Sequence, residues 1–138
     1  MIHHSQRALL RPITPLEDFE KAFNNSDLTM IQRDLIEYIR YVGIFDQVNL
    51  CKALKIPTKP PALSVLCESC RKIGKEIPEH FESVREWSLK VSEHNVHWDG
   101  NLVCSTAWNY DGERLSPESG TTLYHTFSVH KELFTGLN

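Results

Sequence analysis

The chain has 138 residues, of which 41% are hydrophobic and 24% charged, an ordinary balance for a globular domain long enough to bury a core. Its net charge of −3 argues against nucleic acid as the partner, because proteins that bind phosphate backbones usually carry a basic excess. No apolar run approaches the roughly 18 residues of a membrane-spanning helix, so we expect no membrane contact.

The cysteine content and the N-terminal segment indicate an intracellular protein, in the cytoplasm or the nucleus. Four cysteines are too few for a disulfide scaffold in a chain of this length. The opening segment, MIHHSQRALLRPI, lacks the continuous apolar core of a secretory signal. We expect residues 1–13 to form a flexible lead-in and residues 14–138 to form a single α+β domain.

Capping signals and apolar spacing predict the first two helices. The run Thr14-Pro15-Leu16-Glu17 combines a capping box with proline at the first helical position, which predicts a helix over residues 15–24. From Asp27 to Tyr41 the apolar residues recur every three or four positions and form one stripe, with Gly43 as the C′ residue. The members of this stripe are Leu28, Ile31, Leu35, Ile39 and Val42.

A shorter helix and a proline-rich connector follow. Asp46 can act as an N-cap for this helix, and the prolines of residues 57–61 stop it. Pro57 and Pro60 also have the spacing of a polyproline-II ligand, although a rigid connector is the simpler interpretation.

Two further helices complete the helical part of the chain. We expect one over residues 61–73, ending before Gly74, and one beginning at Pro78. Helices should therefore occupy residues 15–93.

The pattern then changes from helical to strand-like. Residues 96–98, the dipeptide Asp99-Gly100 and residues 101–110 are typical of a strand, a type I′ turn and a longer strand. A final strand is expected over residues 121–130, so that an antiparallel sheet occupies residues 95–130. In this last strand one set of side chains should face the core and the other set water. The two alternating sets are Leu123, His125, Phe127 and Val129 against Thr122, Tyr124, Thr126 and Ser128.

The order of these elements predicts the fold class. We expect an α+β fold with an N-terminal array of about five short helices followed by a small antiparallel three-stranded meander.

Cys67 and Cys70 form a Cys-x-x-Cys pair within a predicted helix. They share a face with Leu66 and Ile73, so the simplest interpretation is a pair of buried thiols that pack as small apolar residues. No cofactor is needed in that case. A thioredoxin-like redox pair is disfavoured, because such a pair sits at a helix N-terminus after a strand.

Zinc is the alternative interpretation of the same pair. Cys67, Cys70, His97 and Cys104 would supply a Cys₃His ligand set that ties the strands to the helices. The protein would then be a zinc-stabilised domain of a nuclear factor that could contact nucleic acid. The long interval between Cys70 and His97, and the position of the pair within a helix, argue against this site.

A third hypothesis is a small cysteine-dependent hydrolase. Cys104 with His97 or His125 on a neighbouring strand could form a thiol–imidazole pair. However, Cys104 alternates in register with Leu102, which predicts that its thiol faces the core. The sequence has no P-loop, nucleophile elbow or dinucleotide glycine motif, so we lean away from an enzyme.

Aromatic residues near the junction of helices and strands suggest binding. Trp87, Trp98, Trp108 and Tyr110 lie close together in the sequence, and Trp and Tyr are favoured as interface anchors. We therefore predict a non-enzymatic intracellular protein–protein interaction domain, a subunit or N-terminal module of a larger assembly. It would bind a protein partner through the helix–sheet junction or an exposed sheet edge.

Overall fold

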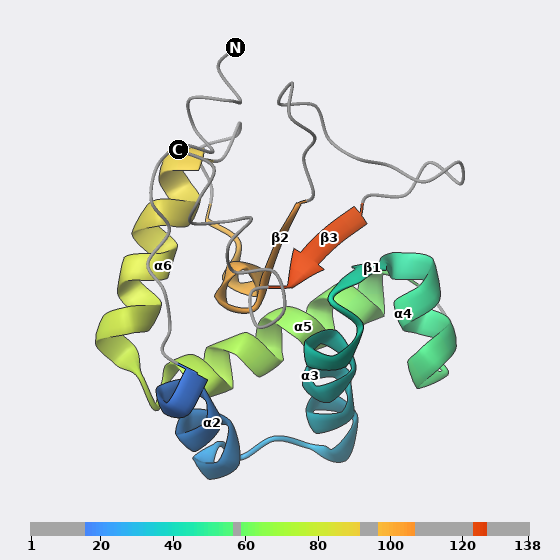
Figure 1. Cartoon of the computed structure of the whole chain (residues 1–138), viewed down its shortest axis with the longest axis horizontal. Helices are drawn as coiled ribbons and strands as arrows, with labels where there is room; N and C mark the ends of the chain where they lie inside the picture. The colour runs from blue at the N-terminus through green and yellow to red at the C-terminus, as the bar shows by residue number, and fades with distance from the viewer. Residues whose placement is uncertain (1–15, 57–58, 92–96, 107–122, 127–138) are drawn as a thin grey trace.

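The structure is a computed structural model, and it describes residues 16–56, 59–91, 97–106 and 123–126 (Figure 1). The described part is mainly helical, with helices of 8 to 16 residues and strands of three or four residues. The predicted lead-in over residues 1–13 lies outside it.

The elements follow one another in a helix-rich order. The α-helices are α2 (Leu16–Asn25), α3 (Met30–Val42), α4 (Gln47–Leu54), α5 (Lys59–Gly74) and α6 (Pro78–Val91), and η1 (Asp99–Leu102) is a 3₁₀ turn. The strands are β1 (Ile44–Asp46), β2 (Cys104–Thr106) and β3 (Leu123–Thr126).

Side-chain caps fix where the helices begin. The Thr29 hydroxyl accepts a hydrogen bond from the Gln32 amide at 3.3 Å, and the Gln32 side chain accepts one from the Thr29 amide at 2.9 Å. This reciprocal capping box starts α3 at Met30, later than the spacing alone predicts. Gly43 ends the helix with a positive φ of 76°, and Asp46 caps α4 by accepting from the Asn49 amide at 2.8 Å, both as predicted.

α5 begins at Lys59, two residues before the predicted start. Pro60 and Pro61 therefore lie in the first turn of the helix, where a missing amide hydrogen has no intrahelical partner to lose. Pro60 is helical and so does not form a polyproline-II segment. Pro57 lies outside the described residues.

The prediction of an α+β fold with helices followed by a three-stranded meander is wrong. β1 comes from the connection between α3 and α4, and the strand order is β1-β3-β2, so the last of the described strands is the central one. All pairings are antiparallel and cover only three residues of each neighbour. The described residues therefore form five α-helices with a few ladder positions attached, and not a sheet that stands beside a helical layer.

The predicted hairpin around Asp99-Gly100 is also wrong. A type I′ turn requires positive φ at both central residues, and among the described residues only Gly43 and Lys55 have positive φ. The chain instead forms η1, with the Asn101 amide donating to the Trp98 carbonyl at 3.0 Å. The cause is tertiary, because the Asp99 side chain is drawn between two helices, as described below.

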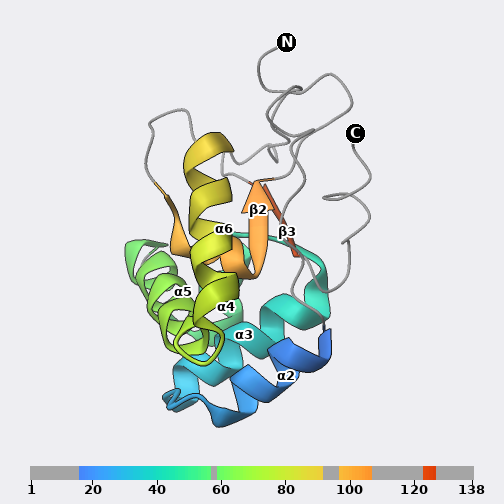
Figure 2. The same cartoon turned by 90° about the vertical axis from the view of Figure 1, so that its left-hand side faces the viewer.

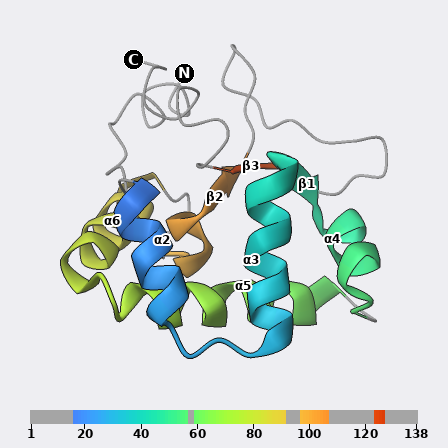
Figure 3. The same ribbon diagram turned by 60° about the horizontal axis from the view of Figure 1, so that its bottom comes forward.

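α5 is the central element of the packing. It runs between α6 at one end and α4 at the other, and α3 lies across it (Figures 1 and 3). Figure 2 shows α6 beside α5 on one side of the molecule. Leu66, Cys70 and Ile73 of α5 are fully buried and contribute to one core with the α3 residues Leu35 and Ile39.

The β3 strand contributes an aromatic side chain to this core. Tyr124 is only 8% exposed, and its ring lies 5.2 Å from that of Phe45 and 5.5 Å from that of Trp98. Tyr124 belongs to the more polar of the two alternating sets of the predicted strand. Long-range aromatic contacts, which alternation does not encode, decide its burial.

α2 is attached to the side of α3 by two arginines. Arg40 forms an ion pair with Glu20, and its guanidinium lies 5.5 Å from the Phe19 ring centre. Arg33 lies 4.8 Å above the Phe23 ring. Cation–π contacts of this kind hold both arginines on the flank of α3 that faces α2.

None of the helices in the described part of the chain is both long and apolar enough to cross a membrane.

Candidate functional site

The structure describes two of the four aromatic residues that the sequence suggested for binding. Trp98 is half-buried and packs against the core through Tyr124, and Trp87 on α6 is also half-buried. Trp108 and Tyr110 lie outside the described residues. The indole of Trp98 therefore serves internal packing at the junction of η1 and β3.

The cysteines of α5 occupy two different environments. Cys70 is fully buried, as the core interpretation predicts, whereas Cys67 is half-buried and lies beside Gly100 and Trp98 of the η1 region. Burial raises the pKa of the Cys67 thiol. Burial, with the neighbouring Cys104 and Cys67, also raises the pKa of Cys70 well above its ordinary value.

The positions of Cys104 and His97 contradict the zinc hypothesis. Cys104 is fully buried and its thiol donates to the Gly100 carbonyl at 3.5 Å, while His97 directs Nε2 toward the Asp99 carboxylate at 3.7 Å. No group of three or more His, Cys, Asp or Glu side chains within the described ranges is placed to hold a metal ion.

The groups named for a hydrolase are also separated by burial and register. The Cys104 thiol has no exposed surface, whereas the His97 side chain is 40% exposed. In the ladder Cys104 pairs with Thr126 and His125 pairs with Ser105, so Cys104 and His125 are not opposite each other. The burial of Cys104 agrees with the prediction that its thiol faces the core.

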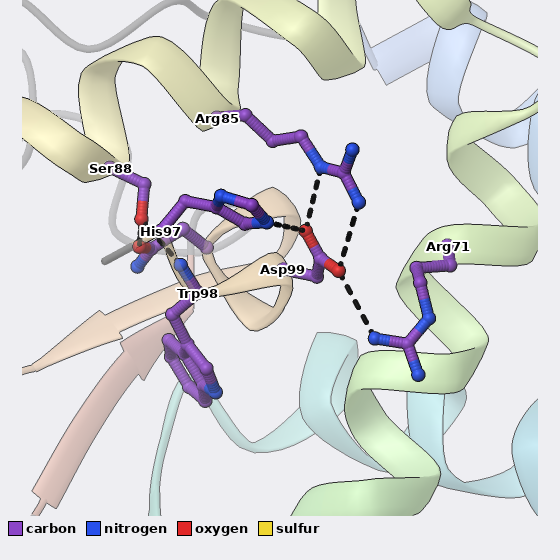
Figure 4. Close-up of polar contacts among 7 residues, drawn as sticks. Arg71, Arg85, Ser88, His97, Trp98 and Asp99 are labelled. Carbon is purple, nitrogen blue, oxygen red and sulfur yellow. Dashed lines mark hydrogen bonds and ion pairs between the residues drawn. The ribbon is translucent and has the colours of Figure 1, made fainter.

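Asp99 is the centre of an ion-pair cluster that joins η1 to two helices (Figure 4). Its carboxylate is 6% exposed and accepts from Arg85 Nε at 2.9 Å, from Arg85 Nη2 at 3.2 Å and from Arg71 Nη1 at 3.1 Å. His97 points toward the same carboxylate from a different direction than the two arginines, and the Trp98 indole points away from it. Arg71 comes from α5 and Arg85 from α6, so one carboxylate connects three elements.

The charges of this cluster explain its protonation state. Burial alone would raise the pKa of Asp99, but the hydrogen bonds from Arg85 and Arg71 and the charge of Arg85 outweigh burial and lower it. The hydrogen bond to Asp99 raises the pKa of Arg85. Asp99 is therefore a permanent anion at neutral pH, which suits a structural ion pair and not a proton-transfer group.

A second polar network lies next to Asp99. The Ser88 hydroxyl donates to the Asn101 side-chain oxygen at 2.7 Å and accepts from the Trp98 amide at 2.8 Å. Asn101 donates to the Cys104 carbonyl at 3.0 Å. These bonds give the Trp98 amide and the Cys104 carbonyl their hydrogen-bond partners. The network therefore has a structural role in holding the turn against α6.

The outer face of α3 has a different character. Met30 and Tyr41 are 81% and 88% exposed, and Asp34 and Glu37, also exposed, lie between them on the same side of the helix. We call these four residues the α3 outer stripe. Their spacings of four, three and four residues place them on one face, opposite the buried Leu35, Ile36 and Ile39.

Sequence reasoning identified α3 but overlooked this stripe. The apolar stripe that predicts the helix leaves out Met30 and Tyr41, and that omission was the available signal. An aromatic and a thioether side chain on the polar face of an amphipathic helix contribute nothing to its core.

A scan against protein-family models, a search of curated proteins and a search of solved structures return no match to this chain.

Proposed function

We propose that the chain is an intracellular protein–protein interaction domain that binds its partner through the α3 outer stripe. The observation that carries the proposal is the exposure of Tyr41 and Met30, at 88% and 81%, on one face of a well-anchored helix. Tyrosine is enriched among residues that dominate binding energy, and methionine adapts its shape to varied partners.

The rest of α3 makes this face a rigid platform. Leu35, Ile36 and Ile39 are fully buried on the opposite side, the capping box holds the first turn, and Arg40 links the helix to α2. A preorganised helix presents its side chains without the cost of ordering its backbone on binding. This support favours α3 over the junction of η1 and β3, where Trp98 is engaged in internal packing.

Charge and thiol state support the choice of partner and compartment. Asp34 and Glu37 lie in the middle of the stripe, so a phosphate backbone would be repelled there. The four cysteines, all of them described residues, form no disulfide, which is usual in the cytoplasm or the nucleus. A protein partner in a reducing compartment is therefore favoured, and the chain would act as a subunit or module of an assembly.

The test begins with the full chain and its double variant Met30→Ser with Tyr41→Ser. Partners captured by the wild-type chain are identified by mass spectrometry, purified, and titrated against both proteins by calorimetry. We expect the double variant to bind at least about 30-fold more weakly, since truncating one interface anchor can cost about 2 kcal/mol. Circular dichroism should show an unchanged fold, because both side chains are exposed.

The matched control is Leu89→Ser with Lys90→Ser on the exposed face of α6. This variant should bind the purified partner with wild-type affinity. Equal affinities of the α3 double variant and the wild-type chain would refute the proposal.

A further inference from the structure

The α3 outer stripe has an acidic centre and apolar ends. Met30 and Tyr41 are 11 residues apart, which separates them by about 16 Å along the helix. Asp34 and Glu37 lie between them, and both are exposed. A partner must therefore offer two apolar contacts at this separation and a group that compensates two carboxylates between them.

The arginines of α3 do not supply that compensation. Arg40 is paired with Glu20 and lies near Phe19, and Arg33 lies over the Phe23 ring. Lys72 of α5 donates to Gln32 at 2.9 Å, on the buried side of α3. These cations face α2 or α5, so the carboxylates of the stripe keep their negative potential toward solvent.

Symmetry shows that a second copy of the chain is an unsuitable occupant. If two α3 helices pack antiparallel, Met30 lies opposite Tyr41 of the other copy, and Asp34 lies opposite Glu37. If they pack parallel and in register, each carboxylate faces the same carboxylate of the second chain. Both arrangements gather four carboxylates at the centre, and directly opposed like charges cost several kcal/mol.

We infer that the α3 outer stripe takes a helix of a different protein, with Lys or Arg at its centre and apolar side chains about 11 residues apart at its ends. This inference rests on the proposed function and specifies the partner's chemistry. The central cations pair with Asp34 and Glu37, while the apolar ends cover Met30 and Tyr41. The charges select the partner, and the apolar contacts supply most of the affinity.

The test uses two fluorescein-labelled helical peptides of about 18 residues. Each has leucines 11 residues apart, and the two differ only at central positions, which are lysine in one and glutamate in the other. Fluorescence anisotropy is measured with the full chain and with the charge-reversed variant Asp34→Lys with Glu37→Lys. We expect the wild-type chain to bind the lysine peptide at least about tenfold more tightly than the glutamate peptide, and the variant to invert this preference.

The control reverses the same number of charges elsewhere. Glu79→Lys with Glu86→Lys changes two exposed residues of α6 and should keep the wild-type preference. Equal binding of both peptides, no binding of the lysine peptide below about 1 mM, or the same inversion in the control would overturn the inference. Sedimentation velocity provides a further test. If the wild-type chain is a dimer and the variant Met30→Ser with Tyr41→Ser is a monomer, the inference is overturned as well.

These outcomes separate the two proposals. Suppose that Met30→Ser with Tyr41→Ser weakens binding of the purified natural partner but charge reversal of Asp34 and Glu37 does not. The stripe is then an interface, but the inference that its partner carries central Lys or Arg residues is wrong. If neither variant weakens that binding, the proposed function itself fails.

Discussion

At the scale of single residues, the Asp99 carboxylate joins η1 to α5 and α6. Two guanidinium groups approach its carboxylate within 3.2 Å, from α5 and from α6. Arg71 is half exposed and Arg85 is 30% exposed, so solvent screens both partners. The pair is worth less than a fully buried one, yet removing the carboxylate leaves two cations facing each other.

The substitution Asp99→Asn should lower the free energy of unfolding by about 1–3 kcal/mol at pH 7, because charge-assisted hydrogen bonds to Arg71 and Arg85 are lost. The folded-state pKa of Asp99 is lowered, so its contribution is fully present above the unfolded value of about 3.9, begins to decline there, and is lost as the pH falls through the lower folded-state pKa. Urea denaturation at about pH 7, 5 and 3.5 should therefore show the same difference between the two proteins at the two higher pH values and a smaller difference at the lowest. If the difference in the free energy of unfolding stays constant over this pH range, the ion-pair account is contradicted. The control is Glu68→Gln, at an exposed position of α5.

The thiols should differ sharply in reactivity. Cys70 and Cys104 have no exposed surface, and burial raises the pKa of Cys70, so neither should react with N-ethylmaleimide in the folded protein near neutral pH. Mass spectrometry should find label on these two cysteines only after denaturation. Rapid native labelling of Cys104 would instead reopen the hydrolase hypothesis.

At the scale of elements, α3 shows how caps and packing share the work of defining a helix. Its last turn is closed by Gly43 and its first by Thr29 and Gln32. Gln32 also accepts from Lys72, so the capping residue of one helix anchors it to α5. The start of α3 is therefore coupled to the core.

Thr29→Ala should reduce the free energy of unfolding by about 1 kcal/mol, since an N-cap hydroxyl is lost. Hydrogen exchange should accelerate most in the first turn of α3. Thr29→Ser retains the hydroxyl and should stay within about 0.5 kcal/mol of wild type. If alanine and serine behave alike, the capping box does not hold the helix start.

Close packing leaves no room for a side chain at two glycines. A Cβ added at Gly100 would lie 2.6 Å from the Trp98 ring, and one added at Gly74 would clash with the Phe81 ring. Both rings are packed against other residues. These two glycines are needed because of close approach, since neither has a positive φ.

At the scale of the whole molecule, α5 determines cohesion. It contacts α2, α3, α4, α6 and η1, and its inward residues are fully buried. Elements that touch one common helix lose their packing together when that helix is disturbed. The described part should therefore unfold as one cooperative unit.

Leu66→Ala should lower the free energy of unfolding by about 2–5 kcal/mol, because it opens a cavity at the centre of α5. Circular dichroism and tryptophan fluorescence should report the same single transition during urea denaturation. Leu89→Ala, at a position that is 37% exposed, should cost less than about 1 kcal/mol. Separate transitions for the two probes would show that the molecule is not organised around α5.

The sequence by itself determined the helices, because their signals are local. The apolar stripe of α3, the Asp46 cap, the Gly43 stop and the Pro78 start each depend on residues within one or two turns. The α3 outer stripe was overlooked, although its signal is local as well, since Met30 and Tyr41 fall outside that apolar stripe.

Only the tertiary structure decided the strands and the Asp99 cluster. β1 is three residues long and pairs with β3 from the far end of the chain, and pairing across such a separation leaves no local pattern. Asp99-Gly100 has the sequence of a type I′ turn, but Arg71 and Arg85 are 28 and 14 residues away from Asp99 and hold it in a 3₁₀ turn. Local propensity yields wherever a buried charge finds its partners on other elements, because leaving that charge unpaired costs more than changing the turn.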